Sequence, residues 1–341
     1  MKAVVKLASG PDQIRHLDWD KPVPGPGQAL LKVLAVGVCG SDVHILHGRF
    51  GGDPPFILGH EFLGQIAEPG PGASCWRKGQ RVVAENISGA CGICMLCRTG
   101  RGYLCPEKRA YGSRSHGAMA EWTVMPAQAL HAVPDSIADE DAALTEPLAI
   151  ACHAALTRGG VGFGEKVLVI GPGPIGLLAV RVAALSGAHL AILGAAEDAS
   201  RLEMGRSMGA ELVLSAADPQ WRSRLERWRP GQPIDCVIEL SGSAAGIVES
   251  IELVGRGRRV VAVGIAGKAV PVPWDEAVVK GIDVRFCFSS AFRDWETALD
   301  MMAQGKINPS ILVTHRFRLE QWRQALELIE KREAIKCLLL P

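Results

Sequence analysis

Four cysteines stand within fifteen residues of this chain, in CGICMLCRTGRGYLC (91–105). Two consecutive Cys-x-x-Cys spacings in a reducing compartment are typical of metal or redox chemistry rather than of disulfides. Four thiolates can close a tetrahedral shell around zinc with no open position, which defines a structural site. A redox dithiol and an iron–sulfur cluster are the alternatives. The spacing favours a structural zinc with the ligands Cys91, Cys94, Cys97 and Cys105.

A second group of metal-binding residue types lies upstream, in GVCGSDVHILHGRF and FILGHEFLG. Cys39, His60 and Glu61 supply one sulfur, one nitrogen and one oxygen donor. Three protein ligands with a water in the fourth position are the pattern of a catalytic zinc site. Each residue taken alone would more often have an ordinary structural role, since a lone cysteine is usually a small buried hydrophobe. The three together indicate a metal site that is open to a substrate.

A glycine-rich loop, GPGPIG, follows the apolar segment 166–171 and opens a segment with helical periodicity, 174–188. Gly-x-Gly-x-x-Gly between a buried strand and a helix predicts dinucleotide binding, because the helix N-terminus attracts a pyrophosphate. A glycine-rich turn without a ligand is the alternative. The residues expected to bind the coenzyme are Gly171, Gly173, Pro174, Ile175, Gly176 and, at the end of a later strand, Gly264.

The choice between NAD and NADP depends on the end of the second strand of this region, in AILGAAEDASRL. An acidic residue there would bind a free ribose 2′-hydroxyl. Residues 194–196 are Gly, Ala and Ala, and Glu197 and Asp198 come directly after them. Arg201 could meet a 2′-phosphate, although a solvated helix residue is the simpler interpretation. Glu197 and Asp198 favour NAD slightly, and the choice stays open.

The elements that must position these groups change in kind near residue 150. Residues 1–150 are rich in glycine and proline, with strand patterns such as 79–85 and 117–126, which predicts a β-rich domain. After residue 150, short apolar strands alternate with helical segments, which predicts an α/β architecture with a parallel sheet covered on both faces. The chain ends in an amphipathic helix, 319–331, and an apolar strand.

Composition excludes several classes of partner. The chain has 341 residues and a formal net charge of +1, with no basic stripe, which argues against nucleic acid. No secretory signal is apparent at the N-terminus, and no apolar run reaches the 18 or so residues that a membrane span requires. We therefore expect a cytoplasmic protein without a membrane partner.

The motifs also occur in a specific order: CGSDVHILHGRF, GHEFLG, the four cysteines, TEPLAIACHAA (145–155), GPGPIG and VTHRF (313–317). Together they resemble the zinc-dependent medium-chain alcohol dehydrogenases, nearest the sorbitol/polyol and threonine dehydrogenase branch. The resemblance covers essentially the whole chain. It implies a β-rich GroES-like catalytic domain formed by residues 1–150 and 287–341, and a doubly wound Rossmann domain formed by residues 151–286.

The resemblance also implies roles for single residues. Cys39 and His60 match the ligands of the catalytic zinc, and Glu61 is similar to the third ligand of this branch. Glu146, in Thr-Glu-Pro, matches a glutamate that in relatives ligates the zinc or approaches it through water. The two glutamates are expected to exchange during turnover, with Glu61 ranked ahead. A carboxylate at a helix start is the simpler alternative for Glu146.

Ser41 and His44 follow Cys39 at short range and resemble the proton relay of the family. The serine would lie next to the alcohol oxygen, and the histidine would pass the proton outward. Turn capping and surface polarity are the ordinary alternatives for these two residues.

The implied reaction is oxidation of a secondary alcohol to a ketone, with hydride transfer to NAD or NADP and two zinc ions per chain. The substrate would be a polyol, sugar acid, cyclitol or amino alcohol; L-threonine 3-dehydrogenase-like activity and a non-catalytic zinc-binding relative are the alternatives. One stretch departs from polyol dehydrogenases: FCFSSAFRDW (286–295) offers only Ser289, Ser290 and Arg293 to a hydroxylated substrate. This puts sorbitol itself in doubt. The resemblance also implies a homotetramer.

Overall fold

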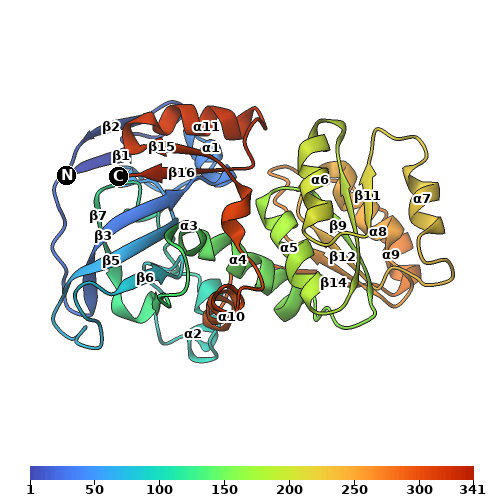
Figure 1. The fold of residues 1–341 in the computed structure, drawn as a ribbon, viewed down its shortest axis with the longest axis horizontal. Helices are drawn as coiled ribbons and strands as arrows, with labels where there is room; N and C mark the ends of the chain where they lie inside the picture. The colour runs from blue at the N-terminus through green and yellow to red at the C-terminus, as the bar shows by residue number, and fades with distance from the viewer. The chain divides into compact units, whose positions relative to one another are not determined.

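The protein divides into two compact units in a computed structural model that describes residues 1–341. The first unit consists of Met1–Glu146 and Ser290–Pro341, and the second of Pro147–Ser289. The first unit is therefore assembled from both ends of the chain, and Figure 1 shows the dark red C-terminal strand beside the blue N-terminal strands. None of the helices combines the length and apolar character that crossing a membrane requires.

The first unit is built on two sheets. The larger one has the strand order β15-β16-β3-β5-β6-β8, with β7 also paired to β3, and the smaller one has the order β2-β1-β4. Their strands are β1 (Lys2–Lys6), β2 (Ile14–Asp18), β3 (Gln28–Gly37), β4 (Phe56–Ile57), β5 (Glu61–Pro69), β6 (Arg81–Ala84), β7 (Trp122–Pro126), β8 (Leu130–Ala132), β15 (Val313–Arg318) and β16 (Lys336–Leu340). The pairing of β16 with β3 brings the C-terminal residues next to the segment that carries Cys39.

The helices of this unit are short and lie around the sheets. They are α1 (Gly40–Leu46), α2 (Met95–Arg98), α3 (Asp139–Ala143), α10 (Phe292–Ala303) and α11 (Trp322–Glu330), with 3-10 turns at η1 (Gly102–Leu104), η2 (Ala127–Ala129), η5 (Pro309–Leu312) and η6 (Leu319–Gln321). The predicted amphipathic helix is confirmed as α11, whose Trp322, Ala325 and Leu326 are buried. The β-rich character predicted for this part of the chain is confirmed as well.

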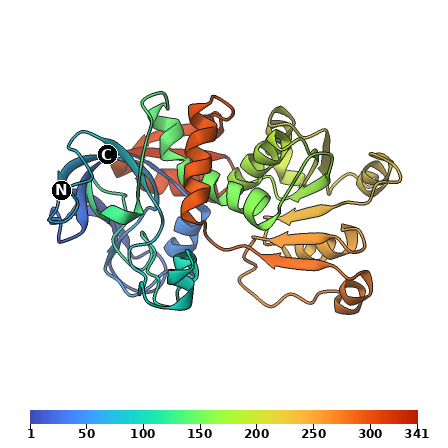
Figure 2. The same ribbon diagram turned by 90° about the horizontal axis from the view of Figure 1, so that it is seen from below.

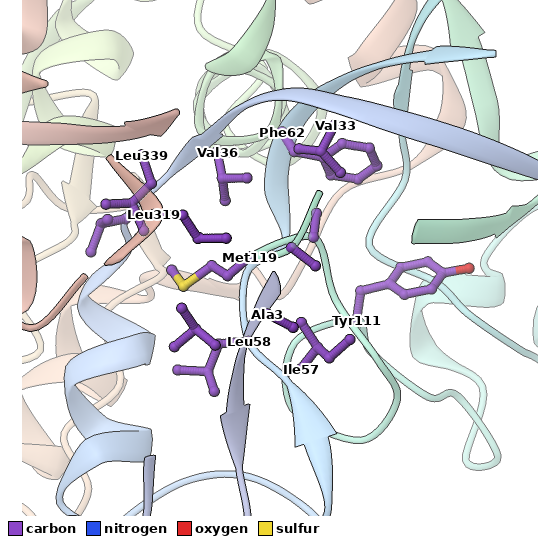
Figure 3. Packing of buried hydrophobic residues seen from close by; sticks show 14 of the residues in the cluster. Ala3, Val33, Val36, Ile57, Leu58, Phe62, Tyr111, Met119, Leu319 and Leu339 are labelled. Atoms are coloured by element: carbon purple, nitrogen blue, oxygen red, sulfur yellow. The ribbon is translucent and has the colours of Figure 1, made fainter. Parts of the chain in front are cut away.

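The hydrophobic core of the first unit lies directly behind the residues of chemical interest. Figure 3 shows Val36, Leu58, Met119 and Leu339 packed together, and all four are almost fully buried. Leu58 precedes His60 by two residues, and Val36 precedes Cys39 by three. Burying one such side chain stabilises the fold by about 1.5–3 kcal/mol, so the core holds both segments in place.

The second unit contains a six-stranded parallel sheet with the order β11-β10-β9-β12-β13-β14. Figure 2 shows β12, β13 and β14 stacked side by side as yellow to orange arrows. The strands are β9 (Lys166–Ile170), β10 (His189–Gly194), β11 (Leu212–Ser215), β12 (Cys236–Glu239), β13 (Arg259–Ala262) and β14 (Asp283–Phe286). Every residue of β9 is buried, as expected for a strand covered on both faces.

Helices connect the strands of this sheet. They are α4 (Thr145–Cys152), which begins at the end of the first unit and continues as the π-helical η3 (His153–Arg158), then α5 (Pro174–Leu185), α6 (Ala199–Ser207) after the turn η4 (Ala196–Asp198), α7 (Trp221–Arg227), α8 (Ala244–Leu253) and α9 (Trp274–Lys280). The predicted α/β fold is confirmed: a parallel sheet connected by helices accompanies a β-rich unit. The strand order reverses between β10 and β12 on either side of β9, and ligands of such sheets bind at this switch point.

Candidate metal centres and dinucleotide-binding loop

The four cysteines of the 91–105 lobe converge on one point. Their sulfur atoms all lie within 4.8 Å of one another. Cys105 Sγ lies 3.6 Å from Cys91 Sγ and 3.9 Å from Cys94 Sγ, and Cys91 Sγ lies 4.0 Å from Cys97 Sγ. A tetrahedron with zinc–sulfur bonds of about 2.3 Å has sulfur–sulfur edges of about 3.8 Å. The arrangement therefore fits a four-thiolate zinc site, and all four cysteines are free thiols.

Local backbone geometry prepares this lobe for an ion. The backbone N–H of Cys94 donates to Cys91 Sγ at 3.4 Å, and that of Cys97 donates to Cys94 Sγ at 3.5 Å. Backbone donors from Cys94 and Ile93 lower the pKa of the Cys91 thiol to about 7. Amide groups that stabilise thiolates favour the deprotonated form that binds metal.

A second group of donor atoms converges in the first unit. The ligand atoms of Cys39, His60 and Glu61 lie within 4.8 Å of one another. Cys39 precedes α1, while Glu61 opens β5 directly after His60. Gly37 in β3 pairs with Glu61 in β5, so two adjacent strands carry the three residues to one place. One soft and two harder donors with no fourth protein ligand in the group fit an open zinc site.

Gly37 is required beside this centre because the Glu61 side chain crosses it. A Cβ atom at residue 37 would lie 2.4 Å from Glu61 Oε2, well inside contact distance. A larger residue in β3 would therefore displace the carboxylate.

A buried lysine completes the centre. Lys336 in β16 is only 3% exposed, and its Nζ lies 2.5 Å from Glu61 Oε2. Burial alone would lower the pKa of Lys336, but the charges of Glu61 and Cys39 raise it above its ordinary value. Glu61 is thus held by a cation in this structure, and any metal at the centre competes with Lys336 for the same carboxylate.

Glu146 lies close to the centre but outside the group of three. It is buried at the start of α4, and burial raises the pKa of its carboxyl to about 7, with the charge of Glu61 acting in the same direction. The charges of His60 and Lys336 act on it in the opposite direction. Glu146 is therefore electrostatically coupled to the centre without being one of its three converging donors.

The centre carries an excess of acidic groups. Asp42 is fully buried, accepts the backbone N–H of Cys39 at 2.9 Å, and has a pKa raised by burial. The pKa of His60 is raised to about 10, because its hydrogen bond with Cys39 and the nearby negative charges outweigh the effect of burial. A divalent cation would balance so many anionic donors around one point, and the residues present therefore fit zinc.

Ser41 and His44 lie in α1, three residues apart and hence on one face of the helix. The Ser41 hydroxyl is buried and has no hydrogen-bond partner, whereas His44 is exposed. A buried hydroxyl without a partner is costly, and a substrate oxygen would satisfy it.

The glycine-rich loop follows β9 and leads into α5, as predicted. Gly171 has a φ of +102°, which a residue with a side chain rarely adopts, and Pro174 occupies the first turn of the helix. A Cβ at Gly176 would lie 2.0 Å from the Gly171 carbonyl oxygen, so helix and loop pack closely. A Cβ at Gly173 would point into open space, where a pyrophosphate has room to approach. The loop therefore fits a dinucleotide, with Ile175 as the second residue of the helix.

The neighbouring loop, after β12, packs against the glycine-rich loop. Buried Glu239 accepts hydrogen bonds from the backbone N–H groups of Ser241 and Gly242 at 2.8 and 3.0 Å. A Cβ at Gly264 would lie 2.2 Å from the Gly242 nitrogen, so this glycine has a packing reason of its own. Glu239 thus organises the switch point, and the predicted Gly264 lies beside it.

The end of β10 offers no strand-end carboxylate, because the strand closes on Gly194. Asp198 is buried and accepts the backbone N–H of Ala195 at 3.0 Å, which commits it to the turn. Glu197 is exposed, and Arg201 lies 3.8 Å from Asp198. Arg201 is mostly buried rather than a solvated helix residue, and the geometry is compatible with either coenzyme.

Some polar groups of the 286–295 stretch stabilise the fold. Trp295 Nε1 donates to Ser290 Oγ at 3.0 Å, and both residues are buried. Arg293 is exposed and Ser289 has a φ of +61°. Ser290 is therefore engaged near the start of α10.

Sequence reasoning overlooked Lys336, Gly37, Asp42 and Glu239. Buried charge could have been inferred from Lys336, which stands within the apolar strand AIKCLLLP, and from Asp42 and Glu239, which stand beside buried segments. No local sequence feature identified Gly37, because its contact with Glu61 depends on the pairing of β3 with β5.

Comparison with known proteins agrees with both units. Residues 25–135 match the family model of the alcohol dehydrogenase GroES-like domain, and residues 174–304 match that of zinc-binding dehydrogenases. The sorbitol dehydrogenase of Halalkalibacterium halodurans is 34% identical and covers 100% of this chain and 99% of the relative. The D-arabitol-phosphate dehydrogenase of Enterococcus avium is 30% identical over 99% of this chain and 97% of the relative. The L-threonine 3-dehydrogenase of Anaeromyxobacter sp. (strain K) is 32% identical over 99% of this chain and 98% of the relative.

Solved structures share the whole architecture. An alcohol dehydrogenase from Escherichia coli CFT073 complexed with NADH matches with a TM-score of 0.90 at 27% identity, covering 100% of this chain and 99% of the other. A protein from Sinorhizobium meliloti 1021 bound to NADP matches with a TM-score of 0.88 at 30% identity over the same shares. Full-length similarity to several curated dehydrogenases, together with both domain models, shows that this chain belongs to the zinc-dependent medium-chain dehydrogenases.

Proposed function

We propose that this protein oxidises a secondary alcohol to a ketone and transfers the hydride to NAD or NADP, using a zinc held by Cys39, His60 and Glu61. The observation that carries the proposal is the convergence of these three donor groups. The glycine-rich loop of the second unit supports a dinucleotide as the hydride acceptor.

The zinc would supply Lewis acidity that makes the alcohol proton more acidic. The remaining steps belong to side chains of this protein. Ser41 accepts the hydroxyl proton of the alcohol at its buried and otherwise unpartnered Oγ and releases its own hydroxyl proton in the same step. His44, exposed one turn along α1, takes up the released proton and passes it to solvent. The bound coenzyme accepts the hydride, and the loop at Gly171–Gly176 orients it.

Lys336 and Glu146 adjust the charge at the centre. We propose Glu61 as the third ligand at rest, because Glu146 lies outside the group of converging donors. Lys336 would keep the Glu61 carboxylate anionic when it leaves the metal, so that Glu146 can take its place.

A second zinc would occupy the four-cysteine lobe, giving two ions per chain. The sulfur–sulfur distances support it, and a shell of four thiolates leaves no position for a substrate. Ten free cysteines also support a reducing compartment, and we propose the cytoplasm.

The relatives named for sorbitol, arabitol phosphate and threonine span the classes of candidate substrate. We propose a polyol or polyol derivative, with L-threonine as the second candidate. NAD and NADP are both candidate coenzymes, because Glu197 and Arg201 lie near the strand end where the two are distinguished.

We also propose that the protein assembles as a homotetramer. β14 is an edge strand of its sheet, and Phe286 in it is 77% exposed. Trp274 in α9 is 70% exposed, and Val278 and Val279 in the same helix are exposed too. Exposed apolar residues next to an open strand edge favour contact with a second copy. Light scattering after size-exclusion chromatography should give the molar mass of a tetramer. Phe286→Lys should give a smaller molar mass, and a monomeric wild type would contradict the proposed assembly.

The central test combines metal analysis with activity. We expect about two zinc ions per chain, and alcohol-dependent reduction of NAD or NADP in a panel of polyols, sugar acids and L-threonine. Cys39→Ser should lose one zinc and nearly all activity, with kcat/KM reduced by about 1000-fold or more, while keeping the other zinc. Activity that survives Cys39→Ser would overturn the mechanism.

A further inference from the structure

A cavity in the first unit is lined by aromatic side chains that the proposed mechanism does not use. Its volume is about 380 Å³, within the range of small-molecule sites. Trp19, Tyr111, His116 and Trp122 line it, whereas none of the proposed zinc ligands does. The chain contains only two tyrosines and eight tryptophans, so three such rings at one cavity are a local concentration. Aromatic walls of this kind are typical of a binding site.

Tyr111 has a hydroxyl group that no other residue uses. The residue is only 4% exposed, and Figure 3 shows its ring directed away from the hydrophobic core, with the oxygen at the outer end. No hydrogen bond joins this oxygen to the rest of the chain, although it stays accessible at the cavity wall. Burial raises the pKa of Tyr111, so the hydroxyl remains a protonated donor. A nearly buried donor without a partner is costly, and a bound acceptor would satisfy it.

The neighbouring rings add donors of the same kind. His116 Nδ1 accepts the backbone N–H of Ile57 at 3.2 Å, and partial burial lowers the pKa of His116. The neutral imidazole therefore carries its proton on Nε2, which is a free donor. The indole N–H groups of Trp19 and Trp122 have no hydrogen-bond partner in the chain either. Donors thus outnumber acceptors among the side chains of the four rings.

The charges beside the cavity favour an anion. The ammonium group of Lys21 lies 3.4 Å from the centre of the Trp122 ring, which holds one cation at this wall. Arg109 adds an exposed guanidinium, and Asp20 is the single carboxylate among the lining residues. Two cations against one carboxylate, together with the unpartnered donors, match a ligand whose acceptor oxygens carry negative charge.

Hydrogen bonds and ring contacts hold the walls of the cavity in place. The N–H of Trp19 donates to the Met1 carbonyl oxygen at 2.8 Å, and the N–H of Gly112, next to the tyrosine, donates to the Ser115 carbonyl oxygen at 3.0 Å. The rings of Trp19 and His116 meet edge to face, with their centres 5.8 Å apart. The rings are therefore positioned before a ligand arrives, which lowers the entropic cost of binding.

We propose that this cavity binds an aromatic carboxylate. The carboxylate accepts the hydrogen bond of the Tyr111 hydroxyl and lies near the cations, while the ring of the ligand packs against the indoles of Trp19 and Trp122. An aliphatic polyol fits less well, because its hydroxyl groups would bring more donors to a wall that already has an excess of them. The site is separate from the alcohol oxidation proposed above, since neither the zinc ligands nor the glycine-rich loop line it.

Three probes of similar size test the class of ligand on the zinc-loaded protein. Benzoate has both the ring and the charge, cyclohexanecarboxylate keeps the charge without the aromatic ring, and benzamide keeps the ring without the charge. Ligand-observed NMR titration measures their dissociation constants. We expect benzoate to bind about fivefold or more tightly than either analogue, because each analogue loses the aromatic contact or the charge-assisted hydrogen bond. If benzoate does not bind, or binds no more tightly than either analogue, the proposal is wrong.

Variants assign the binding to the cavity. Tyr111→Phe should weaken benzoate binding about tenfold, because one charge-assisted hydrogen bond is lost. Trp19→Leu should weaken it about three- to tenfold through the lost aromatic contact, and Trp274→Leu, at an exposed position outside the cavity, should not change it. Unchanged affinity in Tyr111→Phe would overturn the assignment. Tyr111→Phe should also leave the melting temperature of ligand-free protein unchanged or higher, and a lower value would mean that the hydroxyl serves the fold instead.

Cys39→Ser distinguishes the cavity from the metal centre. A carboxylate probe could bind a zinc ion directly, and this variant would then lose the binding. We expect Cys39→Ser to bind benzoate as tightly as the wild type, because Cys39 does not line the cavity. Loss of benzoate binding in Cys39→Ser would place the carboxylate at the metal and overturn the separate site.

Discussion

The four-cysteine lobe and the Cys39–His60–Glu61 centre both gather metal-binding atoms within 4.8 Å, yet their surroundings differ. The lobe helix α2 has no buried residue, and the lobe's sulfur atoms bond to its own backbone N–H groups. The centre lies against the main core and is surrounded by the buried charges of Asp42, Lys336 and Glu146. In the lobe, a bound metal would hold the backbone together in place of a hydrophobic core. At the centre, a hydrophobic core already holds the metal-binding side chains in position.

The largest expected effect separates the two regions by single cysteine substitutions. Cys39→Ser should reduce kcat/KM by about 1000-fold or more, because the several kcal/mol supplied by a Lewis acid are lost, while the fold is kept. Cys97→Ser should instead release the lobe metal and speed amide hydrogen exchange across residues 91–105. Metal content, activity and hydrogen exchange measured on both variants check this.

A matched control is Cys75→Ser, an exposed cysteine outside both groups, which should change none of the three measurements. If Cys97→Ser abolished activity with two zinc ions still bound, the division of roles between the regions would be wrong.

The next effect concerns charge balance, which distinguishes the centre from the lobe. Lys336→Met leaves Glu61 buried without its cation, and breaking a buried pair costs about 3–5 kcal/mol. We expect this loss in the free energy of unfolding of metal-free protein, measured by denaturant titration. Bound zinc should make the loss smaller, because the metal then balances the carboxylate. Lys336→Arg, which keeps the charge, serves as control; equal losses with and without zinc would contradict the competition for Glu61.

This contrast also explains what the sequence could predict. The cysteine lobe and the glycine loop are local: their donors lie within fifteen and six residues, so spacing alone was informative. The Glu61–Lys336 pair joins residues from opposite ends of the chain, and only the pairing of β16 with β3 and of β3 with β5 brings them together.

A third effect tests whether the centre depends on strand packing. Gly37→Ala would place a Cβ 2.4 Å from Glu61 Oε2, which forces the carboxylate away from the other donors. We expect zinc affinity at the centre to fall about 10–100-fold, as for other changes that misorient a ligand, with the lobe metal unaffected. Competition with a zinc chelator measures both sites. Gly40→Ala is the control, because a Cβ there meets nothing within 4 Å; equal effects of the two variants would contradict the steric argument.

The smallest expected effect is on stability, and it tests whether the four-cysteine lobe lacks a hydrophobic core. Ile93 and Met95 are 78% and 73% exposed, so Ile93→Ala should change the free energy of unfolding by no more than about 0.5 kcal/mol. Leu58→Ala, in the core behind His60, should cost about 2–5 kcal/mol because it leaves a cavity. Denaturant titration of the zinc-loaded protein compares the two. A loss above about 2 kcal/mol for Ile93→Ala would mean that this side chain is covered in solution, and the lobe would then be held by apolar contacts as well as by its metal.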